Sequence, residues 1–362
     1  MKIGARIVKT GIAVTITMFI CKVLDLEPAF FGAVSAVINM QPSIFLTLKT
    51  AKDQIVVHIL GVTAGLAFGY LIGGNPLSMG LITILIISLY IKLNLKSGIT
   101  MGIVAALFVL SSNSEQFLPN ALTRTAVIFT GLSTAMLINI VLWPPRYKQQ
   151  FIEKLKESNY EVVRYFCHAV QDYVELENEK PYFDQAQREK VYKLNEESRV
   201  LSGFLMSEGQ LLMQGSSDQD EWLAIAEKFM DYNESLTEKA DRIYDLLPAR
   251  LDRRLKSGAP PISDEFKAIL EILESGCTII VRVNSKLRSV IIERVSAEPE
   301  EISEDYWERM TKAIEQWQPK LTGSYYLHAL IEVAVTANEI KWATRKAKKL
   351  LYESIAKKLT SS

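Results

Sequence analysis

The chain has 362 residues, of which 49% are hydrophobic, and its 41 basic and 41 acidic residues give a formal net charge of zero. This apolar content excludes a disordered chain, and the length suits two domains. Residues 1–145 hold nine Lys and Arg and four acidic residues, whereas residues 146–362 hold the remaining 32 and 37. Neither part is basic enough for a nucleic-acid-binding protein. We therefore expect two domains, 1–145 and 146–362, and no nucleic-acid partner.

Sequence motifs for cofactors and catalysis do not occur. The three cysteines lie far apart, no CxxC motif is present, and the chain has only three histidines. A disulfide framework or a metal site is therefore not expected. The motifs GxGxxG, GxxxxGK[ST] and GxSxG do not occur either. We expect no cofactor, no metal and no enzymatic activity.

Apolar segments follow one another closely through the first 145 residues. About 20 apolar residues cross a bilayer as a helix, and the candidate segments are 10–24, 28–48, 54–74, 77–91, 97–114 and 125–145. The fourth and fifth segments are the weakest, and a buried or re-entrant hairpin is the alternative for them. The first segment follows a basic start without the small residues of a cleavage site, so we expect an uncleaved helix. The pattern predicts six membrane spans.

Loop charges set the expected orientation. Basic residues precede the first segment and follow the second, fourth and sixth, whereas the other loops are acidic or neutral. Positively charged loops stay in the cytoplasm. We therefore expect a multi-pass protein of the cytoplasmic membrane with its N- and C-termini in the cytoplasm.

An internal repeat supports the six segments. A shift of 70 residues matches seven identical pairs without a gap: Ile12 and Ile82, Lys22 and Lys92, Gly32 and Gly102, Val34 and Val104, Ala36 and Ala106, Val57 and Val127, and Gly61 and Gly131. Each unit would contain three spans, and an odd number of spans inverts the second copy. The expected membrane domain is therefore two inverted three-helix repeats, a plan common among transporters.

Two sequence features shape the expected membrane helices. Gly61, Gly65 and Gly69 form a GxxxGxxxG run, which favours close packing of helices rather than substrate contact. The segment from Asn39 through Met40, Gln41 and Pro42 to Ser43 places amides, a hydroxyl and a proline within the second span. Either the helix breaks there around a cavity, or it kinks near the cytoplasmic end and neighbouring helices satisfy the freed backbone groups.

Ionisable groups at the membrane favour an anionic cargo. Lys9, His58, Lys92 and Arg124 are or can become cationic, and no acidic residue lies deep in a span. Such groups are costly in a bilayer and indicate function, although outward snorkelling at the interface explains Lys9 and Lys92 equally well. His58 and Arg124 occupy comparable places on the third and sixth spans. His58 titrates in the range needed to carry a proton.

Beyond residue 146 the sequence predicts a helical bundle. Glu, Lys, Leu and Ile recur with helical periodicity, and the double proline at 144–145 should end the last span. Long helices are expected at about 147–178, 183–214, 218–246, 263–293 and 323–358, with a shorter one at 301–317. Alternation of apolar and polar residues is scarce, so we expect no sheet. The fold class is all-α: a six-span domain followed by a cytoplasmic helical bundle.

One stretch of the sequence resembles a known family. The segment PAFFGAVSAVINMQPSIFLTLKTAKDQIVVHILGVTAGLAFGYLIG, followed by a second three-span unit, resembles the aromatic acid exporter family, which belongs with the fusaric-acid-resistance-like membrane proteins. The similarity is to the small bacterial branch with a helical C-terminal domain. It implies export of aromatic carboxylates such as hydroxybenzoate across the bacterial inner membrane. More distant plant relatives are malate-permeable anion channels.

These observations predict a membrane transporter that exports organic anions and is driven by a proton or substrate gradient. Lys9, Lys92 and Arg124 would attract the carboxylate, His58 would carry a proton, and Asn39, Gln41 and Ser43 would contact cargo around the Pro42 break. Six short spans are few for a complete pathway, so a homodimer or larger assembly in the lipid bilayer is expected. A membrane-anchored sensor or scaffold and a passive anion channel are the alternatives.

Overall fold

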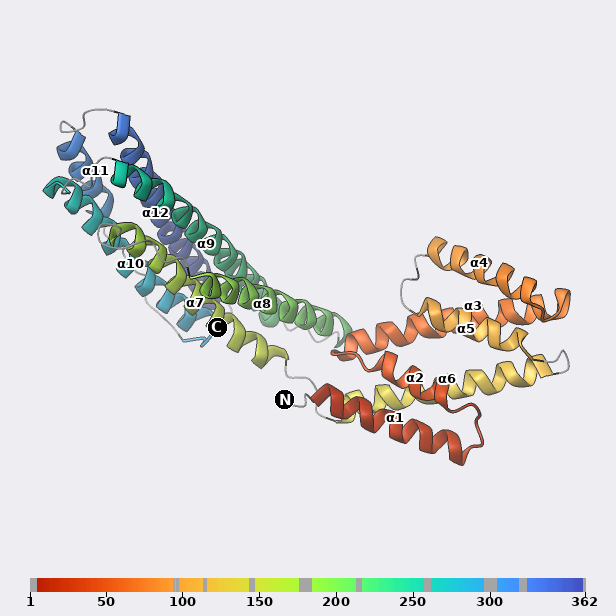
Figure 1. Ribbon diagram of the computed structural model, residues 1–362. Helices are drawn as coiled ribbons and strands as arrows, with labels where there is room; N and C mark the ends of the chain where they lie inside the picture. The colour runs from red at the N-terminus through yellow and green to blue at the C-terminus, as the bar shows by residue number, and fades with distance from the viewer. Residues whose placement is uncertain are drawn as a thin grey trace. The chain divides into compact units, whose positions relative to one another are not determined.

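The protein is helical throughout its described residues. The computed structural model describes residues 5–93, 95, 98–112, 116–142, 147–175, 184–212, 217–256, 262–295, 305–318 and 324–360. Within these ranges the chain forms twelve α-helices and no β-strand, as Figure 1 shows. The prediction of an all-α fold is confirmed for this part of the chain. The double proline at 144–145 lies outside the described residues.

Packing divides the chain into two compact units, Met1–Arg146 and Tyr147–Ser362. The sequence pattern placed this boundary one residue earlier. The helices of the first unit are α1 (Ala5–Val23), α2 (Phe30–Asn39), α3 (Ile44–Ile72), α4 (Pro76–Lys92), α5 (Ile99–Leu110) and α6 (Phe117–Val141). Those of the second unit are α7 (Tyr147–Glu175), α8 (Gln185–Leu212), α9 (Ser217–Lys256), α10 (Asp264–Ile291), α11 (Asp305–Trp317) and α12 (Ser324–Thr360).

The expectation of one continuous span over 28–48 is wrong, because the helix is interrupted inside it. α2 ends at Asn39, and α3 begins only at Ile44. Pro42 lies in the interruption, where it has no N–H to donate and its ring hinders a helical turn. The sequence pattern missed the interruption because the residues on both sides of it are equally apolar.

The expectation of a loop between the second and third segments is also wrong. Ser43 has extended backbone, and its Oγ accepts a hydrogen bond from the N–H of Leu46 at 3.0 Å, which caps the start of α3. The helix then continues through Lys49 and Lys52, both of which are exposed. Charged side chains that reach water do not end a helix, so a charge cluster alone does not mark a loop.

Two helices of the described residues, α3 and α6, are long and apolar enough to cross a membrane by length and composition. α2, α4 and α5 are shorter apolar helices of 10–17 residues. A straight helix needs about 20 residues to span the hydrocarbon core. The two-helix result therefore leaves the six-span layout as a prediction.

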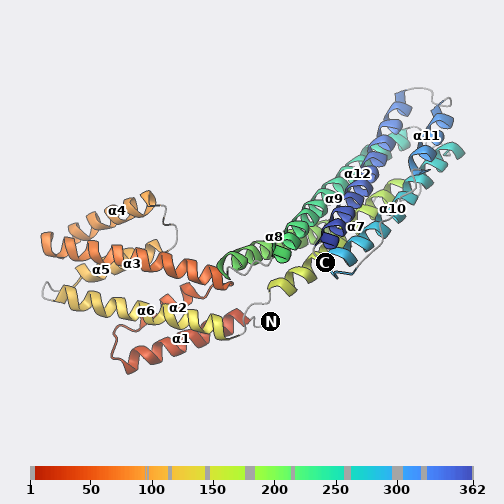
Figure 2. The ribbon, with the colours of Figure 1, turned by 180° about the vertical axis from the view of Figure 1, so that it is seen from behind.

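The six helices of the first unit pack in two matching sets. The shift of 70 residues relates α1 to α4, α2 to α5 and α3 to α6. α2 packs on α6 as α5 packs on α3, and α1 contacts α2 and α6 as α4 contacts α5 and α3 (Figure 2). Each short helix of one repeat thus packs against the long helix of the other repeat. The repeat seen in the sequence is present in the packing of the described helices.

Glycines make the two equivalent contacts possible. A Cβ on Gly131 would collide with the backbone oxygen of Gly32, and a Cβ on Gly61 would collide with that of Gly102. The shift of 70 residues relates Gly32 to Gly102 and Gly61 to Gly131, so these are the same contact in two copies. Only glycine allows backbones to approach this closely.

The second unit is a bundle with one apolar core built from all of its helices except the ends. α7 packs against α8, α9 and α10, and α12 packs against α9 and α10. α9 is longer than the predicted 218–246, because it continues past Pro248 to Lys256. Leu247 is buried and Leu251 is packed on the core on either side of this proline. Their burial holds the helix together where one hydrogen bond is missing.

A buried polar group sets how three of these helices meet. The Nδ2 of Asn159 on α7 donates to the Oδ1 atoms of Asn233 on α9 and Asn284 on α10, at 2.9 and 3.0 Å. Arg288 donates to the Oδ1 of Asn159 at 2.9 Å. Paired amides in an apolar core are stable only when these helices are in one register.

We expect Gly131→Ala to destabilise the first unit, because the added methyl group must push α2 away from α6. Overpacking of this kind costs about 1–3 kcal/mol. The matched control is Gly80→Ala on α4, whose Cβ would meet no atom within 4 Å. The midpoint of thermal unfolding of the full-length protein in detergent should fall for Gly131→Ala and hold or rise for Gly80→Ala. Equal midpoints for the two variants would contradict the close contact.

The second unit should have a pH-dependent stability that Asp172 contributes to. Burial raises the pKa of its carboxyl group above the usual value. The folded chain then binds this proton more tightly than the unfolded chain, so stability is lost as pH rises above about 4. In Asp172→Asn this loss is absent, and the variant should gain on the wild type between pH 4 and pH 7. Tryptophan fluorescence during unfolding measures the difference, and a pH-independent difference would contradict it.

Candidate functional site

Buried polar side chains follow the contact between α3 and α6. Thr47, Gln54 and His58 lie on one side of α3, at spacings that place them on a single helical face. Arg124 and Asn139 lie on α6, and each of these five residues is at most 2% exposed. α3 and α6 touch one another. An unpaired polar group is costly in such a place, so the partners of each one determine what the site can do.

The helix break lies at one end of this series, and donors on neighbouring helices satisfy its backbone carbonyls. Arg6 Nε on α1 donates to the carbonyl oxygen of Met40 at 3.2 Å. Asn139 Nδ2 on α6 donates to the carbonyl oxygen of Gln41 at 3.1 Å. The helix is therefore interrupted at Pro42, and α1 and α6 stabilise the interruption.

Lys9 brings a positive charge to the same end. Its side chain is 6% exposed, so snorkelling to the interface does not describe it. Lys9 Nζ donates to Asn139 Oδ1 at 3.1 Å, and Asn139 Nδ2 also donates to Thr47 Oγ1 at 2.8 Å. One amide thus joins α1, α3, α6 and the break.

Three neutral side chains come next along the series. Gln54 Nε2 donates to Ser35 Oγ at 3.1 Å, and Ser35 Oγ donates to the carbonyl oxygen of Ile128 at 3.0 Å. Asn39 Nδ2 donates to Gln54 Oε1 and, at 2.8 Å, to the carbonyl oxygen of Ser35. This group joins α2, α3 and α6 without a charge.

His58 lies one turn further along α3. Its Nε2 is 2.9 Å from Thr125 Oγ1 on α6. Its Nδ1 is buried and has no hydrogen-bond partner among the described residues. The ring therefore has one nitrogen available to exchange a proton or to contact a further group.

Arg124 ends the series and is the least satisfied member. It is completely buried, and its Nε and both terminal nitrogens have no hydrogen-bond partner in the described part of the chain. The guanidinium lies between two aromatic rings, with its Cζ 2.8 Å from the ring centroid of Phe31 and 4.9 Å from that of Phe108. The two rings contact each other edge to face at 5.8 Å. Cation–π attraction offsets part of the lost hydration but supplies no acceptor for the five N–H groups.

The structure places most of the predicted pathway residues at the break or along this contact. They are Lys9, Asn39, Gln41, Ser43, His58 and Arg124. Lys92 is different, because it is exposed at the end of α4. The shift of 70 residues also places Gln54, not His58, at the position equivalent to Arg124.

The glycine run of α3 packs against its neighbours. A Cβ on Gly61 or Gly65 would meet the backbone of α5, and a Cβ on Gly69 would meet the ring of Phe117 at 2.9 Å. Pro42 marks the break described above.

Sequence reasoning missed five residues of this site: Ser35, Gln54, Asn139, Phe31 and Phe108. The available signal was the spacing of small and polar residues on α3, whose buried face is Thr47, Ala51, Gln54, Val57, His58, Gly61, Gly65 and Gly69. The phenylalanines gave no signal, because aromatic residues in an apolar segment look like lipid-facing ones.

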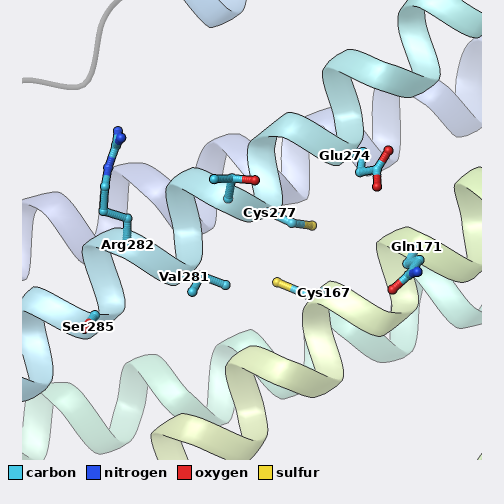
Figure 3. Close-up of a pocket in the computed structure, with 8 residues that line it drawn as sticks. Cys167, Gln171, Glu274, Cys277, Val281, Arg282 and Ser285 are labelled. Carbon is cyan, nitrogen blue, oxygen red and sulfur yellow. The ribbon is translucent and has the colours of Figure 1, made fainter.

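The second unit has a separate cavity of about 600 Å³ between α7 and α10. Figure 3 shows the sulfur atoms of Cys167 and Cys277 directed toward one another across it. A hydrogen bond to Cys167 and burial both raise the pKa of the Cys277 thiol, which disfavours the reactive thiolate. No group of three or more His, Cys, Asp or Glu suited to a metal occurs among the described residues.

Comparison with known proteins gives one family. Residues 1–142 match the model of aromatic acid exporter family member 1. A UPF0421 protein of Bacillus subtilis, YgaE, is 29% identical over 196 residues, which is 54% of this chain and 55% of the relative. A UPF0421 protein of Staphylococcus epidermidis is 32% identical over 165 residues, or 45% and 50%. The chain thus aligns with about half the length of these curated relatives.

Replacement of Arg124 by leucine should stabilise the cargo-free protein. A buried charge without hydrogen bonds costs about 1–3 kcal/mol or more, and an apolar side chain removes this cost. Arg6→Leu is the contrasting variant, because it removes a made hydrogen bond to Met40 and should lower stability. Thermal unfolding in detergent measures both. A lower midpoint for Arg124→Leu would mean that the guanidinium has a partner after all.

Proposed function

Because residues 1–142 belong to the aromatic acid exporter family, we propose that this membrane protein exports organic anions, and aromatic carboxylates in particular. The observation that carries the proposal is Arg124, a buried guanidinium with no hydrogen-bond acceptor among the described residues. A carboxylate supplies the two oxygens that match the guanidinium fork.

The rings beside Arg124 support an aromatic cargo. Phe31 and Phe108 reach the guanidinium from α2 and α5. A flat aromatic acid offers a carboxylate to Arg124 and a ring face or edge to the two phenylalanines. Binding then satisfies the buried N–H groups and keeps apolar surface away from water. An aliphatic acid would gain the ion pair and lose the ring contacts.

The rest of the polar series provides a route to Arg124. Lys9 attracts the anion at the helix break, where Asn39, Gln41 and Ser43 supply polar groups around Pro42. His58 lies between the break and Arg124 and carries a proton. Lys92, exposed at the end of α4, attracts anions to the surface.

The membrane layout follows from the repeat. Six helices, α1 to α6, cross the inner membrane as two inverted three-helix repeats, and the matched packing of α2 on α6 and α5 on α3 supports this plan. Lys9, Lys49 and Lys52 gather at the end of α3 that carries the break, which places that end in the cytoplasm. Residues 147–362 form the cytoplasmic bundle, and the unit assembles as a homodimer or larger oligomer.

The energy source is a gradient. The sequence has no nucleotide-binding motif, so the chain uses the proton gradient or the gradient of the cargo itself, and it catalyses no reaction. A passive anion channel and a membrane-anchored sensor or scaffold are the competing functions, and they differ from the exporter in a flux measurement.

The test is uptake of labelled hydroxybenzoate into inverted membrane vesicles with and without an acidic lumen. Wild-type protein should accumulate label above empty vesicles, and more so with the gradient, because protons leaving the lumen drive cargo inward. Arg124→Gln should reduce uptake at least about tenfold, since a charge-assisted pair contributes about 1.5–3 kcal/mol. The control variant Lys22→Gln, at an exposed position on α1, should transport normally.

Three other outcomes contradict the proposal. Wild-type flux in Arg124→Gln, with normal amounts of protein in the membrane, removes Arg124 from the mechanism. Flux that ignores pH and follows voltage favours a channel. Absence of uptake for every aromatic and aliphatic acid favours the sensor or scaffold.

A further inference from the structure

The repeat gives Arg124 a counterpart. Position 124 in the second repeat corresponds to position 54 in the first, which is Gln54. Both side chains are completely or almost completely buried. They lie on the two long helices that contact each other, α6 and α3. One repeat therefore places a cation where the other places a neutral amide.

Each of these side chains holds together the short helices next to it. Arg124 on α6 lies between Phe31 of α2 and Phe108 of α5. Gln54 on α3 is hydrogen-bonded to α2, and Gly98, which precedes α5, would place a Cβ 3.5 Å from its Cα. Both therefore lie next to the same two short helices, α2 and α5.

The two positions lie toward opposite ends of the pathway. Arg124 contacts Phe31 near the start of α2 and Phe108 near the end of α5. Gln54 contacts Asn39 at the end of α2 and approaches Gly98 at the start of α5. Along α3 and α6, the hydrogen bond between His58 and Thr125 lies between them.

We propose that Ser35, Asn39 and Gln54 form a latch that closes the anion pathway at its cytoplasmic end, as the stack of Phe31, Arg124 and Phe108 closes it at the opposite end. The inference rests on the proposed function for the existence and direction of the pathway. The hydrogen bonds of the latch join α2, α3 and α6, so that end opens only when they break.

The difference between the two ends has a consequence for transport. The latch is neutral and its donors are largely used within it, so an anion gains little there. Arg124 is charged and has no acceptor, so the anion stays at that end. An anion entering from the cytoplasm must part the amides of the latch and leaves them to re-form behind it. The neutral end therefore acts as a gate and the charged end as the binding site.

Accessibility of a single thiol tests the latch without any cargo. The native cysteines Cys21, Cys167 and Cys277 are replaced, and His58→Cys places one thiol between the two ends. The reagent is a membrane-impermeant anionic methanethiosulfonate, added to inverted or to right-side-out vesicles, and the labelled fraction is followed with time. The cysteine-free background is the blank.

Two mirror-image variants give the decisive comparison. Gln54→Ala should raise the labelling rate at least about tenfold from the cytoplasmic side only, because loss of one buried hydrogen bond changes an opening equilibrium by that order. Phe31→Ala is the matched control and should raise the rate from the opposite side only. Gln54→Met, which keeps the volume but not the amide, should behave as Gln54→Ala and serves if that variant does not fold.

The outcomes separate the latch from the proposed function. Labelling that rises from the same side in both variants, or that Gln54→Ala and Gln54→Met leave unchanged, overturns the latch whatever the cargo is. Opposite-sided effects in a protein that takes up no aromatic or aliphatic acid support the latch and reject the export function.

Discussion

The first unit depends on one costly feature, a guanidinium buried in an apolar bundle without a hydrogen-bond acceptor in the described residues. Every other polar group along the contact of α3 and α6 has at least one partner, including the side chains of Thr47, Gln54 and Asn139. The cost of Arg124 is tolerated only because the surrounding helices are held together by other contacts. A group kept unsatisfied in this way is poised to bind an anion.

Backbone chemistry supplies those other contacts. The glycine pairs let α2 approach α6, and α5 approach α3, more closely than any side chain would allow. The interruption at Pro42 shortens α2, and the carbonyls that it frees are bonded by Arg6 and Asn139. The short helices α2 and α5 thus lie against the two long ones with little freedom, and Phe31 and Phe108 are brought to the same guanidinium.

Composition and periodicity were sufficient for the coarse picture: an all-α chain and a first unit related to the aromatic acid exporter family. They were insufficient where tertiary contacts decide. The interruption at Pro42 and the helical course of α3 through Lys49 depend on partners from α1 and α6 and on access to water. The burial of Lys9 and the meeting of Gln54 with Asn39 depend on which helix faces another, and hydropathy does not encode that. The repeat did point to Gln54, as the counterpart of Arg124.

The most direct test of the account is a comparison of two ligands on two proteins. Equilibrium binding of benzoate and of its neutral analogue benzamide is measured on the wild type and on Arg124→Gln in detergent. If Arg124 is the carboxylate site, the wild type binds benzoate at least about tenfold more tightly than benzamide, and the variant loses this preference while keeping part of its affinity for benzamide. An unchanged preference for benzoate in Arg124→Gln would place the anion site elsewhere and contradict the central claim.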